Sequence, residues 1–150
     1  MSILDRYDQA TEKGEQFTLF YNHKSWGSGG RMRIFAELVK QKAIGREEQQ
    51  KFKTLVTESL RLDFPDYSAL ERGVNNRPYG INGGPALAVQ MFPEDPQCKR
   101  HKPWLDALWR ELVEYGDTTE TNYYPYGPLY LQGLYDMAEG MGKFESEREF

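Results

Sequence analysis

The sequence predicts an α+β fold: one mostly helical globular domain over residues 1–150, with four or five helices and a small sheet or hairpin. Several stretches repeat apolar residues at the three-and-four spacing of an amphipathic helix, whereas two short apolar runs, 16–22 and 86–92, resemble strands. A chain of 150 residues with 39% hydrophobic residues is long enough and apolar enough to bury one core.

Three of the expected helices lie in the first 62 residues. The segments 2–13 and 31–42 each place their apolar residues on one face. The segment 47–62 does the same, and it opens with Glu47 and Glu48, whose charges suit the positive end of a helix dipole. This last pattern is the clearest helix signal in the chain.

The two predicted strands are expected to pair with each other. Residues 16–22 are rich in aromatic side chains, which favours a buried strand. In residues 86–92, Leu87, Val89 and Met91 alternate with other residues as in a strand. A helix that starts at Pro85 is the alternative for the second segment, because proline is common in the first turn of a helix.

Loops and two more helices are expected in the rest of the chain. Residues 66–85 consist largely of turn-forming residues, and 93–103 contains three prolines, so both segments are expected to be loops. An apolar stripe over 103–115 that includes two tryptophans predicts a helix anchored in the core. A weaker stripe predicts a last helix over 129–142.

The composition limits the class of protein. No apolar run is long enough to cross a membrane, and the first residues do not resemble a signal peptide, so we expect a soluble cytoplasmic protein without membrane contact. The single cysteine, Cys98, excludes an internal disulfide and, with only two histidines, leaves no zinc-cluster pattern. We predict no metal and no cofactor.

Charge is distributed unevenly along the chain. The net charge is −4, but residues 111–150 hold nine acidic and two basic residues, a local net charge of −7. The first 110 residues therefore carry +3. A negative C-terminal third is suited to a positively charged partner, because opposite potentials speed encounter and reject wrong partners.

Tyrosines are concentrated in the same acidic third, where six of the ten lie between residues 115 and 135. Tyrosine supplies a large contact area with few torsions to freeze, so recognition surfaces use it heavily. Our first hypothesis is therefore a non-catalytic protein-binding protein, such as an inhibitor, an immunity-type protein or an adaptor, that engages a basic partner protein. The predicted partner-binding residues are Tyr115, Asp117, Glu120, Tyr123, Tyr124 and Tyr126.

A glycine-rich stretch, "GSGGR" over 27–31, supports a second hypothesis. Phosphate-binding loops use glycines and backbone N–H groups at a helix start, but this stretch has neither the Gly-Lys-Ser/Thr ending nor the GxGxxG spacing, so a simple turn is favoured. Basic and aromatic residues in two clusters could still bind a nucleotide or nucleic acid, in a binding protein or an enzyme. The residues of this alternative anion-binding site are Lys24, Trp26, Arg31, Arg33, Lys99, Arg100 and Lys102.

Catalysis has little support in the sequence. Cys98 has basic neighbours that would lower a thiol pKa, but it lies in a segment expected to be a proline-bracketed loop, a poor place to hold a base beside it. We therefore expect Cys98 to be an exposed thiol without a role, and we predict no catalytic residue.

Overall fold

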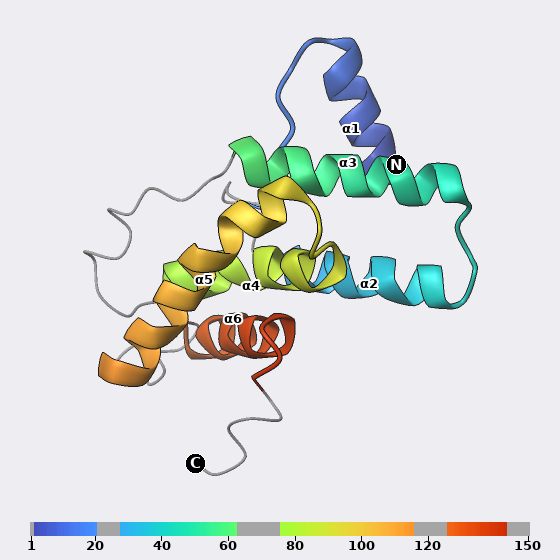
Figure 1. The fold of residues 1–150 in the computed structure, drawn as a ribbon. Helices are drawn as coiled ribbons and strands as arrows, with labels where there is room; N and C mark the ends of the chain where they lie inside the picture. The colour runs from blue at the N-terminus through green and yellow to red at the C-terminus, as the bar shows by residue number, and fades with distance from the viewer. Residues whose placement is uncertain (1, 21–27, 63–75, 116–125, 144–150) are drawn as a thin grey trace.

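Six α-helices make up the described part of the chain in this computed structural model (Figure 1). The structure describes residues 2–20, 28–62, 76–115 and 126–143. The helices are α1 (Ile3–Glu12), α2 (Ser28–Lys40), α3 (Arg46–Leu62), α4 (Asn76–Met91), α5 (Pro96–Tyr115) and α6 (Tyr126–Gly140). Among the described residues no helix is both long and apolar enough to span a lipid bilayer.

The predicted α+β class is wrong, because the described residues contain no strand. Residues 86–91 are the last six residues of α4, and residue 92 follows that helix. The described part of the other predicted strand, 16–20, is irregular and packs as a buried connection: the Leu19 backbone N–H donates to Ser59 Oγ at 2.8 Å. The prediction of four or five helices is also corrected, because the described ranges contain six helices. Helix α4 is the one that the sequence did not predict.

Burial on many sides explains why α4 was missed. Every residue from Asn82 to Ala88 is buried, so this helix has no polar face there to reveal a helical period. Leu87, Val89 and Met91 belong to or pack against the same core group, so their alternation in the sequence does not mark a strand. Pro85 lies inside the helix, and the predicted loop over 66–85 gives way to helix at Asn76.

The predicted loop over 93–103 is also largely wrong, because α5 already begins at Pro96 and Pro103 lies inside it. Asp95 caps the helix: its Oδ1 accepts from the Gln97 backbone N–H at 2.9 Å, and its carbonyl accepts from the Lys99 N–H at 2.9 Å. An aspartate cap followed by proline in the first helical position is a recognised helix start, so this signal was present in the sequence.

The other helix predictions agree with the structure. The predictions over 2–13, 31–42, 47–62 and 129–142 correspond to α1, α2, α3 and α6. Ser2 starts α1 with a capping box, in which Ser2 Oγ accepts from the Asp5 N–H at 3.1 Å and the Ser2 N–H donates to Asp5 Oδ2 at 2.7 Å. Gly14, at a φ of +66°, follows this helix.

Helix α4 is the central element of the fold. It packs against α6, α2 and α5, and Figure 1 shows it between α3 on one side and α6 on the other. Glycines allow these close contacts: a Cβ added at Gly140 of α6 would lie 2.5 Å from the Leu87 backbone nitrogen, and one at Gly84 would lie 2.7 Å from Ser28 Cβ. Larger residues at these two positions would push the helices apart.

Within the described ranges, two groups of buried side chains form the core. In one, Phe35 of α2 stacks on Phe52 of α3 with ring centroids 3.9 Å apart. The other surrounds Trp104 of α5, whose buried Nε1 donates to Asn82 Oδ1 of α4 at 3.2 Å. Trp104 therefore anchors the core as the sequence predicts. Helix α4 contributes side chains to both groups and joins them.

Candidate functional site

The predicted partner-binding residues fall in and beside the segment between α5 and α6. Residues 116–125 lie outside the described residues, and this range holds Asp117, Glu120, Tyr123 and Tyr124. Tyr115 is the last residue of α5 and Tyr126 is the first residue of α6, so these two residues lie at the helix ends next to this segment. The partner-binding prediction itself stays a prediction.

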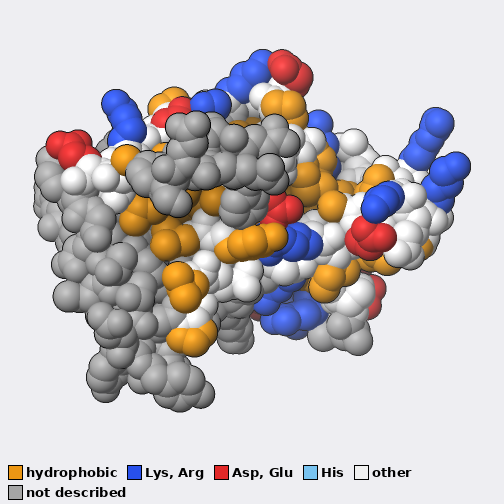
Figure 2. Space-filling view, turned by 90° about the horizontal axis from the view of Figure 1, so that it is seen from below, with side chains coloured by type: hydrophobic (Ala, Val, Ile, Leu, Met, Phe, Trp, Pro, Cys, Tyr) orange, Lys and Arg blue, Asp and Glu red, His pale blue; other side chains and the backbone are white. Residues whose placement is uncertain are grey.

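The two flanking helices expose large hydrophobic side chains. Val113 near the end of α5 is 55% exposed, and Leu131 and Tyr135 of α6 are 57% and 52% exposed. Figure 2 looks onto the side of the molecule that carries α6 and shows hydrophobic side chains gathered there. The remaining large hydrophobic residue of this kind in the described ranges is Ile34 of α2, which is 64% exposed.

Arg33, a member of the alternative anion-binding set, binds two carboxylates of the chain itself. Its guanidinium forms ion pairs with Asp136 and Glu139 of α6, and its Nε donates to Glu139 Oε2 at 2.9 Å. The guanidinium also lies over the Tyr135 ring, 5.0 Å from the centroid. Burial opposes the charge, but the hydrogen bonds to both carboxylates outweigh burial and raise the pKa of Arg33. Two acids of the negative C-terminal third are thus used to bind α2.

Residues 28–31 of the glycine-rich stretch form the first turn of α2 instead of the predicted turn, and Gly29 faces one of these carboxylates; residue 27 lies outside the described residues. A Cβ added at Gly29 would overlap the Asp136 carboxylate, and one at Gly83 of α4 would lie 2.5 Å from Asp136 Cβ. Asp136 is buried, and its Oδ1 accepts from Gln132 Nε2 at 2.7 Å. A buried carboxylate of the chain itself therefore packs against the first turn of α2, and Gly29 and Gly83 allow this close contact.

The other basic residues of the alternative set lie on separate elements. Lys24 and Trp26 are outside the described residues. Arg31 lies on α2, where its Nη1 donates to the Leu19 carbonyl at 3.5 Å, and it lines a cavity between α1, α2 and α3. Lys99, Arg100 and Lys102 lie on the exposed side of α5, and Lys99 and Lys102 line a different cavity.

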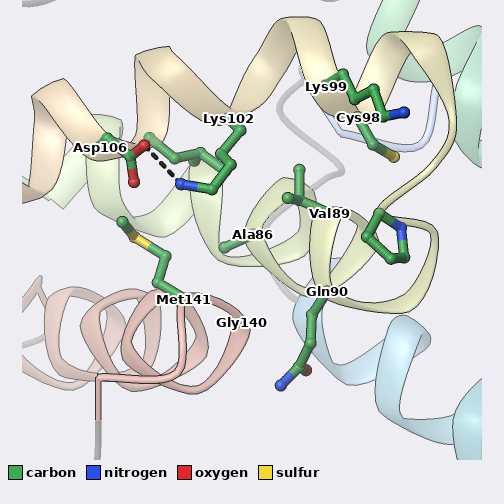
Figure 3. A pocket seen from close by; sticks show the side chains of 11 residues that line it. Ala86, Val89, Gln90, Cys98, Lys99, Lys102, Asp106, Gly140 and Met141 are labelled. Carbon is green, nitrogen blue, oxygen red and sulfur yellow. Dashed lines mark hydrogen bonds and ion pairs between the residues drawn. The ribbon is translucent and has the colours of Figure 1, made fainter. Parts of the chain in front are cut away.

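That second cavity, of about 230 Å³, lies between α4, α5 and the end of α6 (Figure 3). Its wall is mainly apolar, and Lys102 bridges to Asp106 at 2.7 Å along α5. Lys99 pairs with Glu94 at 2.7 Å. The sequence indicated both lysines as anion-binding candidates but placed them in a loop, and it gave no sign of the cavity, which α4 and α6 complete.

Among the described residues, Cys98 and His101, whose side chains could perform nucleophilic or acid–base chemistry, are both buried. Cys98 is not the exposed thiol that was predicted: its Sγ donates to the Ala88 carbonyl at 3.6 Å. Burial, and then the nearby charge of Asp95, raise the pKa of Cys98 to about 12. Burial, and then the charge of Arg100, lower the pKa of His101 to about 4. At neutral pH both side chains are therefore uncharged.

Among the described residues no group of three His, Cys, Asp or Glu side chains is placed to hold a metal ion. In comparisons with known proteins, the chain matches no family model, no curated protein and no solved structure.

Proposed function

We propose that the protein is a non-catalytic protein-binding protein, of the inhibitor, immunity-type or adaptor kind, that engages a basic partner protein. Its binding surface would combine the acidic, tyrosine-rich segment 116–125 with the exposed side chains of the helices on either side. One observation carries the proposal: of the four large hydrophobic residues exposed in the described ranges, three lie on these two helices, namely Val113, Leu131 and Tyr135. Exposed apolar side chains that adjoin charged residues are typical of protein-binding surfaces.

The charge of this region supports a basic partner. Residues 111–150 carry nine acidic and two basic residues, and Arg33 pairs with only two of these acids, Asp136 and Glu139. Glu114, beside Val113, is exposed. Negative groups at the rim attract a positive partner, while apolar side chains in the centre supply the contact energy.

The buried state of Cys98 and His101 supports binding over catalysis. A nucleophilic cysteine needs its thiolate, and a general base needs a pKa near the working pH. Burial shifts the pKa of Cys98 up to about 12 and that of His101 down to about 4, away from both requirements. Neither residue has the exposure or the charge state that a reacting group requires.

The test compares three immobilised forms of the full chain as baits in extracts of the native host. Leu131→Ser together with Val113→Ser removes the exposed side chains beside the segment, whereas Ile34→Ser removes an equally exposed side chain on α2. We expect the unchanged protein and Ile34→Ser to retain the same basic partner, and the double variant to retain at least tenfold less. Higher salt should weaken retention by slowing encounter.

A second variant tests the tyrosines themselves. Tyr124→Ala with Tyr126→Ala, which keeps Asp117 and Glu120, should lose the same partner while thermal unfolding of the bait stays unchanged. Equal retention of the partner by the unchanged protein and all three variants would contradict the proposal. So would an acidic partner whose retention is the same with every bait.

A further inference from the structure

The cavity between α4, α5 and the end of α6 has an apolar inner wall. Ala86 and Val89 of α4 form one side, Cys98 and Leu105 of α5 form another, and Met141 closes it from below in Figure 3. Burial keeps the Cys98 thiol neutral, since its pKa is raised to about 12, so the sulfur behaves as part of the apolar wall. An apolar cavity of about 150 Å³ is enough to bind benzene, so this larger one has room for a short alkyl or aryl group.

The rim of the cavity is charged: two ammonium groups and one carboxylate line it, and Glu94, which pairs with Lys99, lies outside the lining. Lys99 and Lys102 are three residues apart on α5, so they lie on one face of the helix, and both line the cavity together with Asp106. Each lysine is held by an ion pair with an exposed carboxylate, Glu94 for Lys99 and Asp106 for Lys102. Exposed ion pairs of this kind contribute little to stability. A ligand carboxylate can therefore pair with these lysines, in place of or beside Glu94 and Asp106, at a small cost in free energy.

From this arrangement we propose that the cavity binds a small amphipathic anion, a medium-chain carboxylate, with the alkyl chain against the apolar wall and the carboxylate between Lys99 and Lys102. A nucleotide fits the same geometry poorly, because Trp104 is buried in the core and the wall offers few polar partners to a base or ribose. Among the charged residues that line the cavity, an alkylammonium ion would meet two ammonium groups and one carboxylate, that of Asp106.

Methyl NMR of the full chain tests this directly. With ¹³C-methyl-labelled methionine and valine, sodium octanoate should produce saturable shifts at Met141 and Val89, the labelled methyl groups of the wall. Octylammonium chloride, which has the same chain and the opposite charge, should bind at least tenfold more weakly. No saturable shift with octanoate, or equal binding of the two ions, would overturn the proposal.

Lysine variants test the role of the rim without disturbing the core, because both side chains are exposed. Lys99→Gln with Lys102→Gln should weaken octanoate binding about tenfold, since one exposed ion pair contributes a factor of up to about five. Lys40→Gln is the matched control, because Lys40 is also an exposed lysine paired along its own helix, with Glu37. Equal weakening by the control, or none by the double variant, would overturn the role of the rim.

The single cysteine provides an independent readout of where the ligand lies. Cys98 lines the cavity, so saturating octanoate should slow its modification by the neutral reagent methyl methanethiosulfonate at pH 9 by at least threefold. Val89→Phe, which places a ring in the cavity, should abolish octanoate binding while the variant stays folded by thermal unfolding. An unchanged modification rate under saturation would show that octanoate binds elsewhere and would overturn the assignment.

Discussion

Helices α3 and α4 have almost the same length, 17 and 16 residues, but very different surroundings. Helix α3 lies at the outside and buries one face, whereas α4 is buried throughout from Asn82 to Ala88. The sequence predicts α3 almost to the residue and misses α4. The spacing of apolar residues therefore reveals a helix in the sequence only where one side of that helix is exposed to solvent.

The two helices also pack by different chemistry. Helix α3 contributes large side chains such as Phe52, so its stability depends on apolar burial. Helix α4 meets its neighbours through Gly83, Gly84 and Ala86, which bring backbones close together. A large side chain should therefore be needed on α3 and should be harmful at the contacts of α4.

The largest expected effect is the loss of a buried ring on α3. Phe52→Ala removes the partner on which Phe35 stacks and leaves a cavity, which should lower the free energy of unfolding by about 3–5 kcal/mol. Urea denaturation measures the change. Gln50→Ala, on the exposed face of the same helix, should change stability by less than about 0.5 kcal/mol. Similar decreases in the free energy of unfolding for both variants would contradict the conclusion that α3 buries only one face.

Acid should destabilise the buried interior through His101 of α5. Its pKa is about 4 in the folded protein against 6.5 for an exposed histidine, so the unfolded chain takes up the proton first. Its contribution is therefore complete above pH 6.5 and is lost as the pH falls toward 4, a loss of about 3 kcal/mol.

Urea denaturation at several pH values measures this dependence. Between pH 6.5 and 5, the free energy of unfolding should fall more steeply for the unchanged protein than for His101→Gln, which cannot take up that proton. Identical slopes in the two proteins would show that His101 is not a buried neutral group.

A smaller effect is expected where α6 meets α4. A Cβ at Gly140 would come within 2.6 Å of the Ala86 carbonyl oxygen and closer still to other backbone atoms that cannot rotate away. Gly140→Ala should therefore cost about 1–3 kcal/mol by thermal or urea unfolding. Gly30→Ala is the control, because a Cβ there meets nothing within 4 Å and should stabilise α2 slightly. A loss in the control equal to that at Gly140 would contradict close helix packing as the cause.

The smallest expected effect concerns the polar contact between α4 and α5. Asn82→Ala removes the oxygen to which Trp104 Nε1 donates. A double-mutant cycle with Trp104→Phe should give a coupling energy of about 1 kcal/mol, the usual net value of a hydrogen bond. Strictly additive losses would mean that the bond contributes nothing to the packing of α4.

The candidate sites were predictable only in part. Lys99 and Lys102 were singled out by their charge, but their helical spacing and the cavity beneath them depend on α4 and α6. Arg33 was predicted to help bind an external anion, whereas the anions that it contacts in the structure, Asp136 and Glu139, lie more than 100 residues away in the chain. No local pattern can report such a pair.

The sequence by itself determined the one-sided helices α1, α2, α3 and α6 and the second half of α5, because their apolar spacing reflects a boundary between core and water. It also determined the uneven charge along the chain. Only the tertiary structure decided that 86–91 is helical, that Cys98 lines a cavity, and that Gly29 at the start of α2 faces Asp136. The physical reason is that these features arise where distant segments exclude water from one another, and such contacts leave no periodic mark on either segment.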